Sequence, residues 1–226
     1  MKRIQTKVAW GILLTLLLSC ISSNTALAQV TFHELSTVPG YIGGVTLEDC
    51  THVDAEIPPQ AAVAAEVRHL EETLPSLAGL DVPVYTVRQR CILPGFGMLA
   101  GCTLSGKKAV YLFASPRYCS YTIDSAGGVP RMEPFGPYLA AYTVAHEFGH
   151  VVRYQLVNDR TLQEYLKLRG VKANENQWSC HPEEVFAEDF RWLFGSENAR
   201  HVPYLCSIKP PGEKEKQFIL AVLTGE

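Results

Sequence analysis

The 226-residue sequence has the length of one ordinary domain. Its composition, 47% hydrophobic and 19% charged, is that of a globular protein and argues against a disordered chain. The formal net charge of −3 gives no electrostatic reason to expect nucleic acid or an anionic membrane surface as a partner.

Residues 1–28 have the parts of a secretion signal. A basic start precedes the apolar run VAWGILLTLLLSC, and TALAQ then supplies an A-x-A-like cleavage site. The apolar run is too short for a comfortable membrane anchor, so we expect soluble export of a domain spanning residues 29–226. The alternative is a lipoprotein anchored through Cys20, because LLSC resembles a bacterial lipoprotein processing box.

Removal of that signal would leave an even number of cysteines. They are Cys50, Cys91, Cys102, Cys119, Cys180 and Cys206. An even number outside the cytosol favours three disulfides, for which fifteen connectivities exist. The absence of a C-x-x-C pair argues against a thiolate metal site. We expect one bond between Cys91 and Cys102 across a hairpin, and another between Cys180 and Cys206.

The first half of the mature chain predicts one helix and a few strands. Glycine and proline indicate an extended segment over residues 29–58. Residues 60–77 place apolar side chains at helical spacing. Residues 81–90 and 107–115 are short and rich in β-branched and aromatic residues, which indicates strands with a loop or irregular hairpin between them. Turn-forming residues over 116–136 indicate a long irregular loop.

The second half is helical in pattern. A long helix is expected over residues 138–155, interrupted only by Gly149. Shorter helices are expected over residues 161–168, 182–194 and 213–223. One helix, a small set of strands and then several helices indicate a single α+β domain.

The long helix carries the motif HEFGH. Because residues four apart lie one above the other on a helix, His146 and His150 can offer imidazole nitrogens to one metal ion. Glu147 projects beside them, where it can reach a water molecule on that ion. The small residues Ala145 and Gly149 would let another element pack closely. A structural histidine pair is the alternative, so the motif needs a third ligand.

Glu184 and Glu188 supply that ligand and its support. They lie four apart on the helix predicted over 182–194, so they share one face. The same helix is strongly apolar, through Val185, Phe186, Phe190, Leu193 and Phe194. Burying carboxylates among such residues is costly unless they are paired or bind metal. Glu184 would ligate Zn²⁺ and Glu188 would orient a histidine. Glu183 competes as ligand but lacks a partner four residues on.

HEFGH followed downstream by EEVFAEDF resembles the gluzincin metallopeptidases, and within them the group that includes the anthrax lethal factor catalytic domain and the Pro-Pro endopeptidases. The resemblance covers roughly residues 137–195. It implies a zincin-like domain, with a small strand set followed by the HExxH helix and the glutamate-ligand helix. It also implies zinc on His146, His150 and Glu184, with Glu147 as general base and Glu188 behind a ligand.

The sequence departs from the family at one position. The family's transition-state tyrosine lies seven residues before the glutamate ligand, where this chain has Gln177. His181 is the nearest polar candidate for stabilising an oxyanion, and Tyr142 and Tyr154 are others. Each is as readily an ordinary cap or core residue, so the role stays unassigned.

The resemblance also suggests how a substrate would bind. In gluzincins an edge strand ahead of the motif helix pairs with an extended peptide, and residues 109–115 fit that strand or a plain core strand. We therefore expect a secreted, monomeric zinc endopeptidase acting on a peptide or protein. The alternatives are a non-catalytic zinc- or peptide-binding module, an amide hydrolase of the cell wall, and a structural surface protein without metal.

Overall fold

The computed structural model of the chain describes residues 32–35, 46–48, 58–93, 97–106, 108–115, 118, 121–124, 131–134, 136–172, 180–204 and 208–225. The expected secretion signal, Cys20 and Gln177 lie outside these residues, as do Cys50, Cys119 and Cys206. None of the described helices combines the length and apolar character needed to cross a bilayer.

The described part of the chain has an α+β fold, as the sequence predicts. Its helices are α1 (Gln60–Thr73), α2 (Pro75–Ala78), α3 (Gly136–Leu156), α4 (Asp159–Arg169), α5 (Pro182–Phe194), α6 (Glu197–His201) and α7 (Glu213–Thr224). The single helix expected over residues 60–77 is instead two, because Pro75 lacks the N–H that would continue the first and begins the second. The short helix α6, capped by Ser196, is not among the predicted elements.

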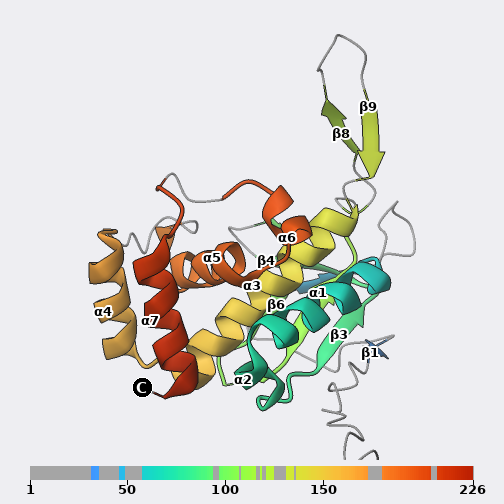
Figure 1. The fold of residues 1–226 in the computed structure, drawn as a ribbon. Helices are drawn as coiled ribbons and strands as arrows, with labels where there is room; N and C mark the ends of the chain where they lie inside the picture. The colour runs from blue at the N-terminus through green and yellow to red at the C-terminus, as the bar shows by residue number, and fades with distance from the viewer. Residues whose placement is uncertain are drawn as a thin grey trace, which may run out of the picture.

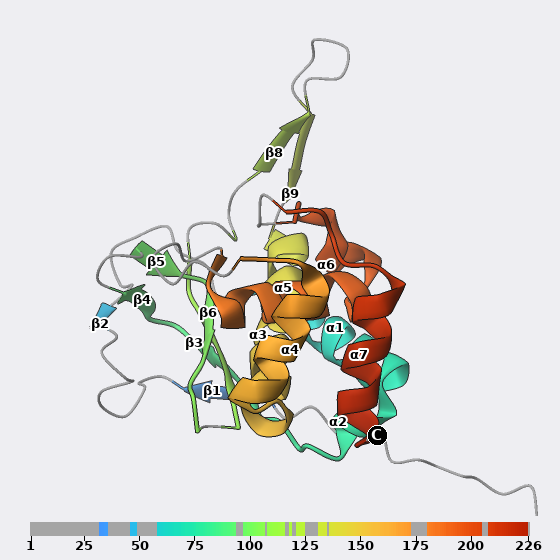
Figure 2. The same ribbon diagram turned by 90° about the vertical axis from the view of Figure 1, so that its left-hand side faces the viewer.

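The strands form three small sheets. They are β1 (Phe32–Leu35), β2 (Thr46–Glu48), β3 (Val84–Val87), β4 (Arg90–Leu93), β5 (Gly97–Leu99), β6 (Gly101–Thr103), β7 (Val110–Phe113), β8 (Tyr121–Asp124) and β9 (Arg131–Pro134). The main sheet has the order β1-β3-β7-β6, in which β6 is antiparallel to β7 and forms an edge. A hairpin of β8 and β9 stands where an irregular loop was expected, and it extends away from the body in Figure 1 and Figure 2.

The main sheet has a helical face and a strand face, which Figure 2 separates. Val84, Val110 and Leu112 point to the helical face and join the large core with α1, α3 and α5. Val87 and Phe113 belong instead to a second cluster with Cys91. The alternation of side chains along each strand produces these two layers.

Cys91 and Cys102 both belong to that second cluster, but both are free cysteines. The disulfide expected between them is therefore not formed in this structure. Burial raises the pKa of the Cys91 thiol to about 12, and it also raises the pKa of Cys102. The expected Cys180–Cys206 bond involves a residue outside the described part of the chain and stays a prediction.

Helix α3 is the central element of the domain. It crosses the molecule between α1 and α5 and packs against both, and against α6 near its start (Figure 1). Its residues are buried without interruption from Thr143 to Arg153. The HEFGH motif therefore lies in the most enclosed stretch of the fold, where polar side chains must find partners.

Candidate metal centre

The Nε2 atoms of both motif histidines face the carboxylate of Glu184. One turn of α3 separates His146 from His150, and their ring centroids lie 4.9 Å apart. His146 Nε2 lies 3.1 Å from Glu184 Oε2, and His150 Nε2 lies 3.4 Å from Glu184 Oε1. The carboxylate of Glu184 thus faces both imidazoles, as the sequence predicts.

Close contact between two helix backbones brings Glu184 to this point. Helix α5 crosses α3 at Gly149, where an added Cβ would lie 2.6 Å from Ala187 Cα and 2.8 Å from its carbonyl oxygen. Only glycine permits this approach. Glu184 and Glu188, which flank Ala187 on α5, are carried against the histidines by it. The prediction that Gly149 allows close packing is confirmed.

Replacing Gly149 with Ala is expected to force α5 away from α3. We expect a loss of about 1–3 kcal/mol in the free energy of unfolding, as for other overpacked cores, and weaker zinc binding because Glu184 moves with α5. Chemical unfolding and zinc titration measure the two effects. Gly79→Ala is the matched control, because its added Cβ meets nothing closer than 3.5 Å. Equal behaviour of the two variants would contradict this account.

The distances within the His146–His150–Glu184 group fit a metal ion. Ligand atoms that each lie 2.0–2.1 Å from a tetrahedral zinc are separated by about 3.3 Å. The separations of 3.1 and 3.4 Å join the two Nε2 atoms to different oxygens of Glu184, and one ligand atom from each of the three residues lies within 4.8 Å of the others. Two imidazoles and one carboxylate also form a donor set that zinc accepts while keeping a fourth position for water. The group can therefore hold a divalent metal.

Glu188 supports His146 from behind. Its Oε2 lies 3.2 Å from His146 Nδ1, and the carboxylate is 1% exposed. When Nε2 binds a metal, this contact would keep the proton of His146 on Nδ1. His150 differs, because its Nδ1 has no hydrogen-bond partner among the described residues.

Without a metal, a proton on His146 stabilises the His146–His150–Glu184 group. Burial lowers the pKa of His146, but the hydrogen bonds and charges of Glu184 and Glu188 outweigh it and raise that pKa to about 10. Burial acts to raise the pKa values of both glutamates. His150 and His146 nevertheless lower the pKa of Glu184, and His146 with Arg191 lowers that of Glu188 to about 2. A protonated His146 thus occupies the role that a cation would take.

These shifts predict how the stability of the metal-free protein depends on pH. The raised pKa of His146 stabilises the fold fully below its ordinary value of 6.5, and this contribution is lost as the pH rises toward about 10. The lowered pKa values of Glu184 and Glu188 stabilise the fold above pH 4.5, and this contribution is lost as the pH falls further. The contribution is therefore greatest between pH 4.5 and 6.5. Urea unfolding of chelator-treated protein measures it, and His146→Gln should remove the alkaline loss.

Glu147 lies beside the group but does not join it. Its side chain is buried, and Oε2 has no hydrogen-bond partner among the described residues. Burial raises the pKa of Glu147, although the charges of His150 and His146 oppose the rise. A carboxylate with a raised pKa and an unused oxygen, next to a metal position, is suited to exchange a proton with water there.

The edge strand β6 lies directly over Glu147. A Cβ on Gly101 would meet Thr143 Cγ2 at 2.6 Å and Glu147 Oε1 at 3.1 Å. Thr103 donates a hydrogen bond from its hydroxyl to the backbone oxygen of Glu147 at 3.1 Å. Of the two alternatives for residues 109–115, the structure supports the plain core strand, because β7 lies inside the sheet between β3 and β6.

The structure separates the two candidate ligands at the start of α5. Glu183 accepts a hydrogen bond from Tyr154 Oη at 2.7 Å and lies 3.4 Å from Arg153 Nη2. Glu184, by contrast, faces the histidines. The choice of Glu184 over Glu183 is therefore supported by where the adjacent side chains point.

The structure leaves the oxyanion role unassigned among its three candidates. His181 is the N-cap residue of α5 and makes no capping hydrogen bond with its side chain, and it does not belong to the metal-binding group. The hydroxyl of Tyr154 is used by Glu183. The hydroxyl of Tyr142 is buried and has no partner among the described residues.

Two aromatic contacts and one arginine were missed by reasoning from the sequence. Tyr142 stacks on His146 and Tyr154 stacks on His150, with interplanar angles of 18° and 15°. Their spacing of four residues along α3 is the signal that could have revealed both pairs. Arg191, three residues after Glu188 on α5, binds its carboxylate.

Comparison with known proteins adds no relative to this picture. No family model, curated protein or solved structure matches the chain. The functional argument therefore depends on the geometry of the site and on the motif resemblance.

Proposed function

We propose that this protein is a zinc-dependent endopeptidase with a zincin-like domain, exported by its N-terminal segment. The observation that carries the proposal is the convergence of His146, His150 and Glu184, with Glu147 buried beside them. Two histidines of one helix and a glutamate of another leave one position for water, which is the ligand set of a hydrolytic zinc site.

The residues of the site have separate roles in the proposed hydrolysis. His146, His150 and Glu184 would hold the zinc ion, which when bound would supply a Lewis acid for the peptide carbonyl and the attacking water. Glu147 accepts the proton of the attacking water and passes it to the leaving amine. Glu188 keeps the proton of His146 on Nδ1, so that Nε2 stays available as a ligand.

The free edge of β6 supports an extended peptide as the substrate. Phe113 N–H donates to the carbonyl of Ala100 at 2.9 Å, and in an antiparallel pair such hydrogen-bonded positions alternate. Ala100 and Cys102 therefore turn their backbone groups toward β7. Gly101 and Thr103 turn theirs outward, where no described strand pairs with them.

A peptide added to this edge would lie over the metal group. Gly101 and Thr103 both contact the turn of α3 that holds Glu147. Their outward N–H and C=O groups would hold a substrate backbone by strand addition, whatever its side chains. We propose this mode of binding, and it places the peptide bond within reach of Glu147.

The proposal is tested by metal analysis of the purified protein together with cleavage of a peptide library, with and without a chelator. We expect one zinc per chain, cleavage inside peptides, loss of cleavage with the chelator and its recovery on adding zinc. Bound zinc without cleavage of any peptide would favour a binding module, and cleavage of cell-wall amides alone would favour the other hydrolase. A protein without metal would contradict all three.

A further inference from the structure

Arg191 is a fully buried arginine that the proposed mechanism does not use. It is 0% exposed, and its partner Glu188 is 1% exposed. Arg191 Nε donates to Glu188 Oε2 at 2.9 Å, and Nη2 donates to Glu188 Oε1 at 2.5 Å. This two-bond fork is the strong, directional form of an arginine–carboxylate pair. A buried charge pair of this kind needs a reason, because burial of ions is costly.

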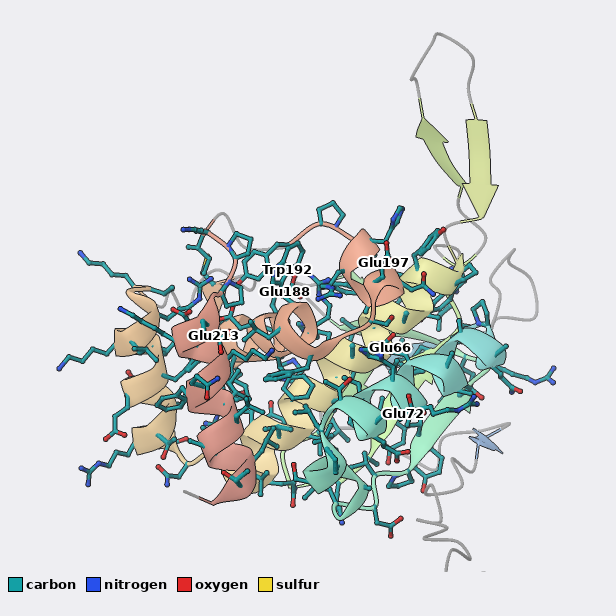
Figure 3. The ribbon with its side chains drawn as sticks, viewed as in Figure 1. Glu66, Glu72, Glu188, Trp192, Glu197 and Glu213 are labelled. Atoms are coloured by element: carbon teal, nitrogen blue, oxygen red, sulfur yellow. The ribbon has the colours of Figure 1, made fainter. Side chains whose placement is uncertain are left out.

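The remaining donor nitrogen of Arg191 anchors it to the end of α6. Nη1 donates to the backbone carbonyls of Ala199 at 2.6 Å and Val202 at 3.3 Å, at the end of α6. Its guanidinium carbon lies 4.6 Å from the ring centre of Tyr142 and 5.4 Å from that of Trp192. Figure 3 labels Glu188 and Trp192 on α5. Arg191 is therefore held by contacts to α3, α5 and α6.

The contacts continue from Arg191 to a metal-binding atom. Glu188 Oε2, which accepts from Arg191 Nε, is the same oxygen that lies 3.2 Å from His146 Nδ1. Tyr142 contacts both ends of this series of residues. Its ring lies against the guanidinium of Arg191 and stacks on the His146 ring, with the two ring centroids 5.8 Å apart. We call these four residues the Arg191 cluster. In it, the position of one oxygen determines the plane and the protonated nitrogen of His146.

We infer that Arg191 is a positioning residue of the metal centre, acting through Glu188 on His146; this rests on the proposed zinc site. Arg191 offsets the charge of the buried carboxylate and holds Oε2 where His146 Nδ1 can donate to it. Without Arg191, the buried carboxylate of Glu188 would lose the two hydrogen bonds of the guanidinium fork and be less firmly held against His146.

Zinc affinity of the folded protein, measured by competition with a chromophoric chelator, tests the inference. We expect Arg191→Met to bind zinc 10–100-fold more weakly, the loss typical of outer-shell partners. Arg191→Lys keeps the charge but not the fork, so it should also bind more weakly. If the Met variant does not fold, the zinc affinity of Arg191→Lys tests the inference in its place.

Arg169→Met is the matched control. Arg169 makes a similar buried pair with Asp189, the residue next to Glu188, at 2.8 Å, but contacts no member of the Arg191 cluster. The control should lose stability yet keep its zinc affinity. A general loosening of α5 would instead lower zinc affinity in both.

A double-mutant cycle identifies the route of the effect. In the Glu188→Ala background, Arg191→Met should cause no further loss of zinc affinity, because the link to His146 is already broken. Unchanged affinity in folded Arg191 variants, or an equal loss with and without Glu188, would overturn the inference alone. A wild-type protein that binds no zinc would overturn it together with the proposed function.

Discussion

Replacing Glu147 with Gln is expected to lower peptide cleavage by about 10²–10⁴-fold, the range typical of a general base. The amide has nearly the shape of the carboxylate but cannot accept a proton from water. The zinc content should be unchanged, because Glu147 is not among the three ligand residues. Steady-state cleavage of a peptide identified in the library screen, with metal analysis of the same sample, measures both quantities.

Thr103→Val is a useful control for this variant. It leaves the carboxylate in place but removes the hydroxyl that donates to the backbone oxygen of Glu147 and that lowers the pKa of its side chain. Its cleavage rate should fall far less than that of Glu147→Gln. Full activity of Glu147→Gln with zinc bound would contradict the assigned role of the base.

Replacing Glu184 with Gln is expected to weaken zinc binding by more than about 100-fold, since removal of a ligand should exceed the 10–100-fold cost of losing an outer-shell partner. Glu183→Gln should bind zinc as the wild type does, because Glu183 faces Tyr154 and Arg153. Zinc titration against a chelator compares the two variants directly.

Glu183 and Glu184 form a closely matched pair of positions for this test. They share a helix turn and a charge, so a general electrostatic attraction of zinc to α5 would be weakened equally by either change. A larger loss from Glu183→Gln than from Glu184→Gln would show that the ligand had been assigned to the wrong residue.

The local relations within the site could be predicted from the sequence. Helical spacing alone pairs His146 with His150, and Glu184 with Glu188. Their convergence is tertiary and does not follow from periodicity. Two sequence signals pointed to it: the carboxylates of Glu184 and Glu188 lie on a strongly apolar helix, and Gly149 permits close contact with another backbone.

The arrangement of the strands could not be predicted in the same way. Alternation of β-branched and aromatic residues identifies β3 and β7 as strands, but strand order depends on long-range pairing. The edge strand β6 has only three residues, Gly101–Thr103, and little β propensity, so its composition did not reveal it. The sequence therefore could not decide whether residues 109–115 form an edge strand or a core strand, and it did not identify β6 as the edge.

The buried network behind the histidines was hidden for a related reason. Arg191 follows Glu188 by three residues, which on a helix usually indicates a solvent-exposed ion pair of small effect. Only the packing of α5 against α3 and α6 makes this pair fully buried. Burial converts an ordinary surface pattern into a constraint on His146.

A crystal structure of the zinc-loaded protein, with anomalous diffraction measured at the zinc absorption edge, tests the central claim most directly. We expect one strong peak bonded to Nε2 of His146, Nε2 of His150 and a carboxylate oxygen of Glu184, with water in the remaining position. A peak elsewhere, or a Glu184 side chain turned away from both histidines, would contradict the account.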